Sequence, residues 1–166
     1  MLQEPEHHGY RCGFVAIVGR PNVGKSTLMN HLIGQKISIT SKKAQTTRHK
    51  ITGIHTDKTV QFVFVDTPGF QINHLNALND RLNLNVTEAM SGVDVVILVV
   101  EAMRFTDADR VVMNKLPKHI PVLLVVNKID KEKAKDKYAL NAFIDEVKAE
   151  FEFAGHEVVS AKHGLR

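Results

Sequence analysis

Short runs of β-branched and other apolar residues alternate along the chain with longer amphipathic stretches. Apolar runs typical of strands cover residues 14–18, 51–56, 61–66, 93–100, 121–127 and 157–160. Stretches with helical periodicity cover residues 25–33, 106–116 and 135–153, and a further one lies around residues 75–90. This alternation predicts an α/β fold in which helices cover both faces of a mostly parallel sheet.

Two details refine this prediction. Thr56-Asp-Lys-Thr59 separates the second and third apolar runs and is typical of a hairpin turn, so the strand before it should be the one antiparallel edge strand of a six-stranded sheet. The last helical stretch has apolar residues at helical spacing that should face the sheet: Tyr138, Phe143, Ile144, Val147 and Phe151.

Composition sets limits on the protein class. A hydrophobic content of 43% suffices for one core, so we expect one domain at residues 10–166 after a flexible leader at residues 1–9. The charge of +4 suits a polyanionic partner and equally an ordinary globular protein. Cys12 has no second cysteine to pair with, and its position beside the first apolar run predicts a buried thiol in a reducing cytosol. No stretch has the apolar length that crosses a bilayer.

The first motif lies where a predicted strand meets a predicted helix. Gly19-Arg-Pro-Asn-Val-Gly-Lys-Ser26 matches GxxxxGK[ST], the phosphate-binding loop. Gly19 and Gly24 let backbone amides turn toward phosphates, and the Lys25 ammonium reaches the β- and γ-phosphates. The Ser26 hydroxyl is a ligand for Mg²⁺. The motif alone does not choose between ATP and GTP.

Asp66-Thr-Pro-Gly69 closes the third predicted strand and lies beside that loop. The Asp66 carboxylate is expected to hold Mg²⁺ through a water molecule. The Gly69 amide is expected to meet the γ-phosphate, so that loss of this phosphate releases the segment that follows.

The base is chosen by Asn127-Lys-Ile-Asp130, which follows the fifth predicted strand. The Asp130 carboxylate is suited to accept hydrogen bonds from the ring N–H and the exocyclic amino group of guanine, a pair that adenine lacks. Ser160-Ala-Lys162 follows the sixth strand, where the Ala161 amide is expected to meet the guanine carbonyl oxygen and Lys162 to cover the base. In this order and at strand ends, the motifs indicate a guanine nucleotide site.

Residues 42–49 form a polar, basic segment between the first helix and the second strand. Thr46 and Thr47 both offer a second hydroxyl for Mg²⁺. The lysines and the arginine of this segment suit RNA contact, although basic loops are more often simply solvated.

Together with Gly34-Gln-Lys-Ile-Ser-Ile-Thr-Ser-Lys-Lys-Ala-Gln-Thr-Thr-Arg48, these motifs resemble the bacterial Era GTPases, a family of the translation-factor-related P-loop class, from residue 10 to residue 166. The resemblance implies binding of GTP and GDP, Mg²⁺-dependent hydrolysis, and a role in maturation of the small ribosomal subunit with its 16S rRNA. The resemblance also implies peripheral contact with the inner membrane. We expect a cytoplasmic monomer. Carried over to this chain, it assigns the phosphate loop to Asn22, Val23, Gly24, Lys25, Ser26 and Thr27, the magnesium threonine to Thr47, and the guanine site to Asn127, Lys128 and Asp130.

In this family a C-terminal KH domain holds the rRNA. No GXXG loop of that kind is present here, and the chain ends soon after the sixth predicted strand. We therefore expect a G domain that lacks its last covering helix and the KH domain.

Phe70 stands where Ras-type enzymes have the glutamine that orients the attacking water, so hydrolysis should be slow. Related GTPases with asparagine at the position of Asn22 use K⁺ as a catalytic cation, whereas an asparagine there can also merely brace the loop. Arg48 is a weaker candidate for a catalytic charge.

Two other classes compete with a GTPase. An ATP-dependent P-loop kinase shares the first motif but has no use for Asn127 and Asp130 in their spacing. A nucleotide-sensing module with negligible turnover fits the motifs and Phe70, and only measured phosphate release separates it from an enzyme.

Overall fold

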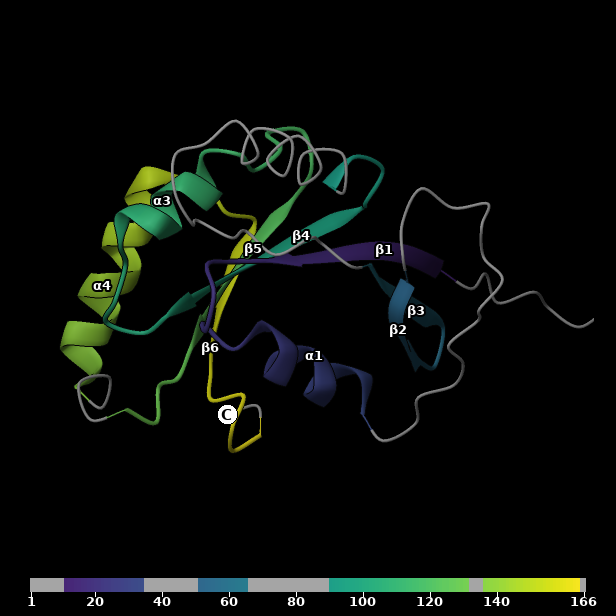
Figure 1. The fold of residues 1–166 in the computed structure, drawn as a ribbon, viewed down its shortest axis with the longest axis horizontal. Helices are drawn as coiled ribbons and strands as arrows, with labels where there is room; N and C mark the ends of the chain where they lie inside the picture. The colour runs from purple at the N-terminus through teal and green to yellow at the C-terminus, as the bar shows by residue number, and fades with distance from the viewer. Residues whose placement is uncertain (1–10, 35–50, 66–89, 132–135, 165–166) are drawn as a thin grey trace, which may run out of the picture.

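The computed structural model describes residues 11–34, 51–65, 90–131 and 136–164 (Figure 1). The strands of this part are β1 (Arg11–Val18), β2 (Ile51–Asp57), β3 (Val60–Val65), β4 (Val95–Glu101), β5 (Val122–Asn127) and β6 (Gly155–Val159). Its helices are α1 (Lys25–Ile33), α3 (Asp107–Met113) and α4 (Lys137–Glu150).

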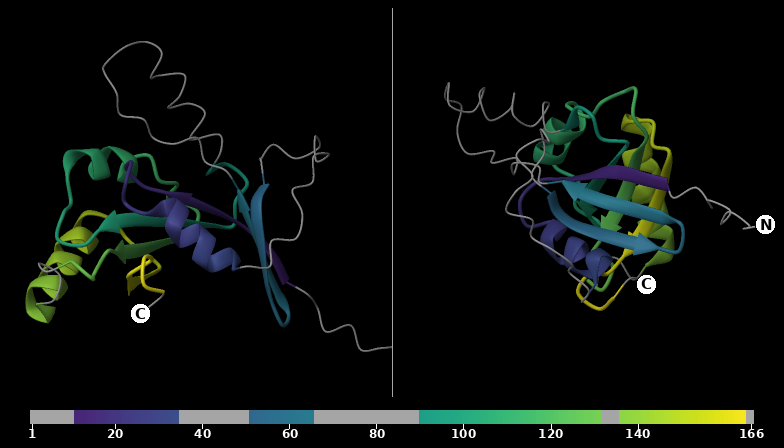
Figure 2. Two further views of the ribbon diagram at one scale, coloured as in Figure 1. Left: turned by 60° about the horizontal axis from the view of Figure 1, so that its bottom comes forward. Right: turned by 90° about the vertical axis from the view of Figure 1, so that its right-hand side faces the viewer.

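The strands form one six-stranded sheet in the order β2-β3-β1-β4-β5-β6. β2 runs antiparallel to β3, and every other neighbouring pair is parallel. The β2–β3 hairpin stands at one edge of the sheet, nearest the viewer in the right-hand view of Figure 2. The predicted fold class is therefore confirmed, including the antiparallel edge strand.

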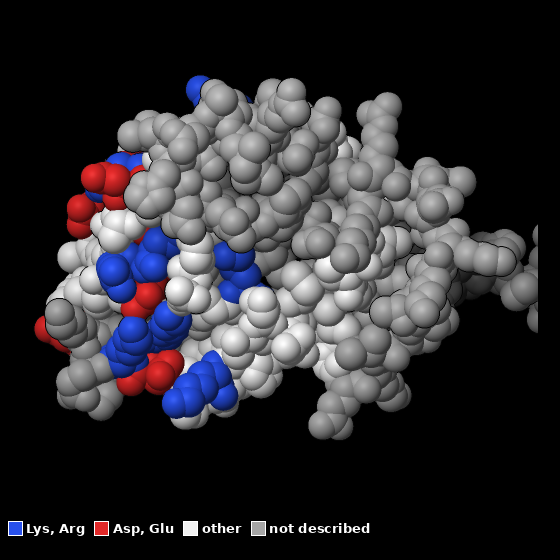
Figure 3. Space-filling view, in the orientation of Figure 1, with Lys and Arg blue, Asp and Glu red and all other residues white. Residues whose placement is uncertain are grey.

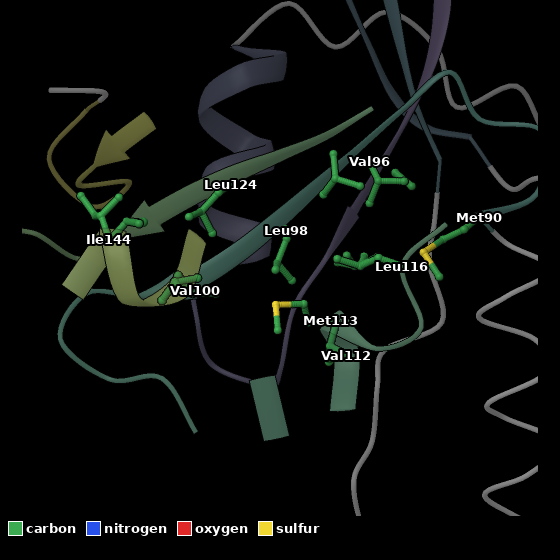
Figure 4. Packing of buried hydrophobic residues seen from close by; sticks show 14 of the residues in the cluster. Met90, Val96, Leu98, Val100, Val112, Met113, Leu116, Leu124 and Ile144 are labelled. Carbon is green, nitrogen blue, oxygen red and sulfur yellow. The ribbon is translucent and has the colours of Figure 1, made fainter. Parts of the chain in front are cut away.

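Alternate residues of the central strands serve different faces of the sheet. Val15 and Ile17 of β1 belong to the cluster that contains Leu28 and Ile33 of α1. Ala16 and Val18 belong to the opposite cluster, which includes residues of α3 and α4 (Figure 4). Buried on both faces, the inner strands consist of continuous apolar runs, as a parallel sheet between helices requires.

Local capping explains why two helices begin later than the pattern predicted. The Asp136 carboxylate accepts hydrogen bonds from the Tyr138 and Ala139 amides at 2.9 and 3.3 Å, so α4 begins at Lys137. Thr106 is the N-cap of α3, and its amide donates to Oδ2 of Asp109 at 2.8 Å. Ser, Thr and Asp prefer these positions because they satisfy amides that the first helical turn leaves unpaired.

The structure corrects two predicted side-chain positions. Cys12 is exposed, because β1 begins at Arg11, before the sheet reaches the two core clusters. Tyr138 is 90% exposed, since it lies in the first turn of α4 away from the sheet. The helix predicted around residues 75–90 lies outside the described residues except for Met90, which is buried.

Within the described residues, the helices lack the length and apolarity that spanning a membrane requires. On the face shown in Figure 3, charged side chains are unevenly spread over the described residues. Lys and Arg gather with Asp and Glu on the side of the view where α4 and the C-terminal loop lie, and the centre is largely uncharged (Figure 3).

Gly53 of β2 is the point where the edge strand packs on α1. A Cβ at this position would lie 2.0 Å from Cδ1 and 2.7 Å from Cγ1 of Ile33. The strand register shifts between Ile51 and Gly53, which is where a bulge brings the backbone toward the helix. Only glycine allows this approach with Ile33 in place.

We predict that Gly53→Ala lowers the free energy of unfolding by about 1–3 kcal/mol, the usual effect of overpacking a core. Ile33→Val removes the clashing Cδ1 atom and should restore part of that loss in the double variant. Gly155→Ala is the matched control, because its Cβ would meet Leu123 Cδ2 at an ordinary 3.5 Å. The free energy of unfolding is measured by urea titration for the parent, Gly53→Ala, Ile33→Val, the double variant and Gly155→Ala. Equal stability of Gly53→Ala and the parent contradicts this packing.

Candidate functional site

The loops that carry the sequence motifs lie at one edge of the sheet. Residues 19–24 connect β1 to α1, Asn127 ends β5, and Ser160 follows β6. Because β1, β4, β5 and β6 are parallel neighbours, their carboxyl ends share this edge. Ligands of open α/β sheets bind outside the carboxyl ends of the strands.

The loop before α1 needs glycine at two positions. A Cβ at Gly19 would lie 2.4 Å from the Val99 carbonyl oxygen, and one at Gly24 would lie 2.2 Å from Nδ2 of Asn127. Gly24 has φ of 102°, and Asn22 is also left-handed with φ of 65°. Loops that contain such left-handed residues form concave nests of amides that bind anions.

Helix α1 begins directly from this loop. Its N-cap residue, Gly24, has no side chain that can bond the first amides of the helix. These amides, with the positive end of the helix dipole, are therefore open to an anionic ligand. Ser26 and Thr27 lie in the same first turn and are exposed.

The Lys25 ammonium is held by the loop itself. Its Nζ donates to the carbonyl oxygens of Gly19 and Arg20, each at 2.8 Å. Burial and, to a smaller extent, the charge of Arg20 lower the pKa of Lys25. Both causes disfavour the ammonium, so a bound anion would offset them.

Asn127, at the end of β5, connects the loop before α1 to the loop after β6. It is 2% exposed; its Nδ2 donates to the Val23 carbonyl oxygen at 2.8 Å, and its Oδ1 accepts from the Ala161 amide at 2.9 Å. Sequence reasoning had assigned Asn127 and the Ala161 amide to the base. Here they are bonded to each other, so a base would have to share the Ala161 amide.

Asp130 is positioned by the loop after β6. The Ser160 hydroxyl donates to Oδ1 of Asp130 at 2.6 Å, and this bond is the main cause that lowers the pKa of Asp130. Asp130 is thus a carboxylate at neutral pH. His163 Nε2 lies 3.9 Å from its Oδ2, and Lys162 in the same loop is exposed.

Lys128 lies across the phosphate loop. Its backbone is left-handed, with φ of 67°, and its Nζ donates to the carbonyl oxygen of Asn22. The same ammonium is 3.3 Å from Oε2 of Glu101. No hydrogen bond engages the Asn22 carboxamide in the described part of the chain, so bracing by this side chain is not observed there.

Sequence reasoning missed a set of charged residues behind the loop. Arg20, only 8% exposed, donates to Glu101 and to Asp109, each at 3.0 Å. Burial alone would raise the pKa of Glu101, but bonds from Lys131 and Arg20 and the charge of Lys128 lower it to about 2. The sequence did contain a signal for this role of Glu101, because it is a charged residue at the end of the otherwise apolar strand β4.

The remaining predicted site residues lie outside the described residues. They are Thr47, Asp66 and Gly69, together with Thr46, Arg48 and Phe70. Of the predicted magnesium ligands, Ser26 alone is described. Its exposed hydroxyl, next to the open amides of α1, suits a magnesium ion held beside phosphates.

Comparison with known proteins agrees with this geometry. A sequence model of the family described as 50S ribosome-binding GTPase matches residues 14–128. GTPase Era of Neisseria meningitidis serogroup B is 82% identical over 158 residues, which are 95% of this chain and 52% of that protein. The chain thus spans about half the length of the curated relatives it matches.

Solved structures give the same result. A variant of Aquifex aeolicus Era bound to GDP·AlF4⁻ has a TM-score of 0.72 and 34% identity, over 93% of this chain and 53% of that one. Era in complex with MgGDPNP and nucleotides 1506–1542 of 16S ribosomal RNA has a TM-score of 0.71 and 34% identity, over 94% and 53%. With the P-loop GTPase fold, the phosphate loop and the family match in agreement, the chain belongs to the family of 50S ribosome-binding GTPases and is of the Era type.

Proposed function

We propose that this chain binds GTP and GDP with Mg²⁺ and hydrolyses GTP slowly, as the G domain of an Era-type switch. The observation that carries the proposal is the bracing by Asn127, which joins the phosphate loop to the loops of Asp130 and Ala161. One residue thereby places an anion-binding loop and a carboxylate suited to guanine within a single site.

The phosphates belong at the start of α1. The loop amides, including those of Val23 and Gly24, and the first amides of α1 supply donors, and Lys25 supplies the charge. In this role the Lys25 ammonium exchanges the Gly19 and Arg20 carbonyl oxygens for phosphate oxygens. Thr27 adds a second hydroxyl next to Ser26.

The base belongs between Asp130 and the residues after β6. Since Ser160 occupies Oδ1 of Asp130, the remaining acceptor capacity is available to the N–H and amino groups of guanine. Lys128 and Lys162 flank the base with their aliphatic stems. Adenine would leave Asp130 without a donor pair, which a dedicated polar site rejects strongly.

Magnesium would be held by Ser26 and Thr47, and by Asp66 through a water molecule, with the Gly69 amide on the γ-phosphate. Bound there, the ion supplies positive charge that stabilises the phosphates as the β–γ bond breaks. For hydrolysis we further propose that the Asn22 side-chain oxygen holds K⁺ in the place of an arginine finger.

In the cell, we propose a role in maturation of the small ribosomal subunit in the cytoplasm, with peripheral contact to the inner membrane. The support for the ribosomal role is the related Era structure that contains 16S ribosomal RNA. Since relatives are about twice as long, we propose RNA binding for a protein of that full length, mainly through a C-terminal KH domain of the kind that the family has. We propose residues 10–166 as one monomeric G domain.

We predict that Lys25→Ala weakens GTP binding at least tenfold, because a hydrogen bond to a charged group contributes about 1.5–3 kcal/mol. Ser26→Ala should mainly raise the Mg²⁺ concentration needed for turnover. Lys148→Ala, at an exposed position of α4, is the control and should bind like the parent. Nucleotide titration and phosphate release measure these effects. A parent that binds GTP without releasing phosphate would instead favour the nucleotide-sensing module.

We predict that Asp130→Asn shifts preference from guanine to xanthine nucleotides by up to about 10⁴. The Ser160 hydroxyl should keep the asparagine oxygen on its side and leave the amide nitrogen facing the base, where it donates to the 2-oxo group of xanthine. Asp136→Asn preserves a helix cap and is the matched control. Competition between GDP and XDP decides, and a variant that still prefers GDP contradicts the assignment.

We predict that K⁺ stimulates GTP turnover over Na⁺ by about tenfold or more, as a partial substitute for an arginine finger, which contributes about 10³–10⁵. The stimulation should disappear in Asn22→Ala, because that variant lacks the side-chain oxygen. Turnover is compared in KCl and NaCl at equal ionic strength. Equal rates for the parent in both salts remove K⁺ from the mechanism.

A further inference from the structure

Three charged side chains are buried behind the phosphate loop. Arg20 comes from the loop, Glu101 from the end of β4 and Asp109 from the first turn of α3, and they are 8%, 4% and 1% exposed. The Arg20 guanidinium bridges the two carboxylates, with Nη2 3.0 Å from Glu101 Oε2 and Nε 3.0 Å from Asp109 Oδ2. Its planar fork suits such double pairing.

Arg20 also contacts Lys25 through its backbone, as Gly19 does. The carbonyl oxygen of Arg20 accepts a hydrogen bond from Lys25 Nζ at 2.8 Å. The guanidinium fixes one side of the residue while its backbone holds the phosphate-binding ammonium on the other. A shift of Arg20 would therefore move the backbone of the phosphate loop, which carries the amides suited to phosphate.

Asp109 holds Arg20 through a single oxygen. Oδ2 accepts from Arg20 Nε, from the Thr106 amide and from the Thr106 hydroxyl, the latter two at 2.8 Å. Oδ1 is buried and has no hydrogen-bond partner among the residues that the structure describes. Burial of a carboxylate with one unpartnered oxygen costs free energy, and the charged hydrogen bond with Arg20 offsets part of that cost.

Glu101 and Asp109 differ in what else they contact. Glu101 also pairs with Lys128 and Lys131 of the loop after β5, so it acts on the base side of the site as well. Within the described residues, Asp109 is hydrogen-bonded to Arg20 and Thr106 and makes no hydrogen bond to Asp130 or Ser160. Its influence should therefore be confined to the phosphate loop.

We propose that Asp109 is a positioning residue for the nucleotide phosphates, which holds the phosphate loop in its binding shape through Arg20. The proposal rests on the proposed function, because it assigns residues to the same nucleotide site. Under this proposal, a residue at the start of α3, remote from the loop in sequence, affects the affinity for the phosphates and leaves the affinity for the base unchanged.

Asp109→Asn tests the charge with little change in shape. The asparagine oxygen replaces Oδ2 and keeps its three hydrogen bonds, and the amide nitrogen replaces the unpartnered Oδ1. Asp107→Asn is the matched control on the same helix, since the Asp107 side chain is fully exposed and, among the described residues, pairs with Arg110 alone. Affinities for GDP and for guanosine, which lacks phosphates, are measured by titration with the full chain, together with the melting temperature.

We expect Asp109→Asn to bind GDP about tenfold more weakly, which corresponds to about 1.4 kcal/mol, and guanosine as the parent does. Arg20→Lys keeps a positive charge but cannot bridge both carboxylates, and it should show the same selective loss even if Asp109→Asn folds poorly. Asp107→Asn should match the parent with both ligands.

Parental GDP affinity in Asp109→Asn and Arg20→Lys overturns the positioning role, and so does an equal loss for GDP and guanosine. A lowered melting temperature with parental GDP affinity also overturns it, because the network would then be only structural. A parent chain that binds no GDP overturns the proposed function itself, and is thereby distinguished from failure of the positioning role.

Discussion

The Asn127 carboxamide donates to the Val23 carbonyl oxygen and accepts from the Ala161 amide, and the arrangement of the whole site depends on this pair of hydrogen bonds. They connect residues that are 104 and 34 positions apart in the chain. Gly24 belongs to the same constraint, because a Cβ there would collide with Nδ2 of Asn127. The asparagine of one motif therefore requires the glycine of another, independently of any ligand.

Behind the loops that Asn127 connects, the buried carboxylates of Glu101 and Asp109 lie among several Lys and Arg side chains. Glu101 alone pairs with Arg20, Lys128 and Lys131, and its pKa falls to about 2, so it stays charged throughout the physiological range. Lys25 has no carboxylate partner in the described residues, and its ammonium rests on backbone carbonyl oxygens instead. The cluster thus keeps an excess of positive charge at the mouth of the phosphate loop, which favours a polyanionic ligand.

The sheet provides the rigid frame for these contacts. β4 and β5 contribute residues to both core clusters, so the residues at their ends, Glu101 and Asn127, which are themselves buried, have little freedom to move. Loops at the carboxyl ends of such strands present functional groups from a fixed edge. The left-handed backbones of Asn22 and Lys128 lie at this edge, and such sparsely populated conformations cluster at functional sites.

The sequence by itself determined the fold class, the order of the described strands and helices along the chain and the antiparallel hairpin, because these follow from local periodicity and turn chemistry. It also located the described motifs at strand ends. It misplaced Cys12 and Tyr138, since an apolar residue near the end of an element can lie outside the core. Only the tertiary structure decided that Asn127 braces the loops and that Arg20 meets Glu101 and Asp109, residues 81 and 89 positions away. Such contacts depend on how strands align across the sheet, which no local pattern of residues encodes.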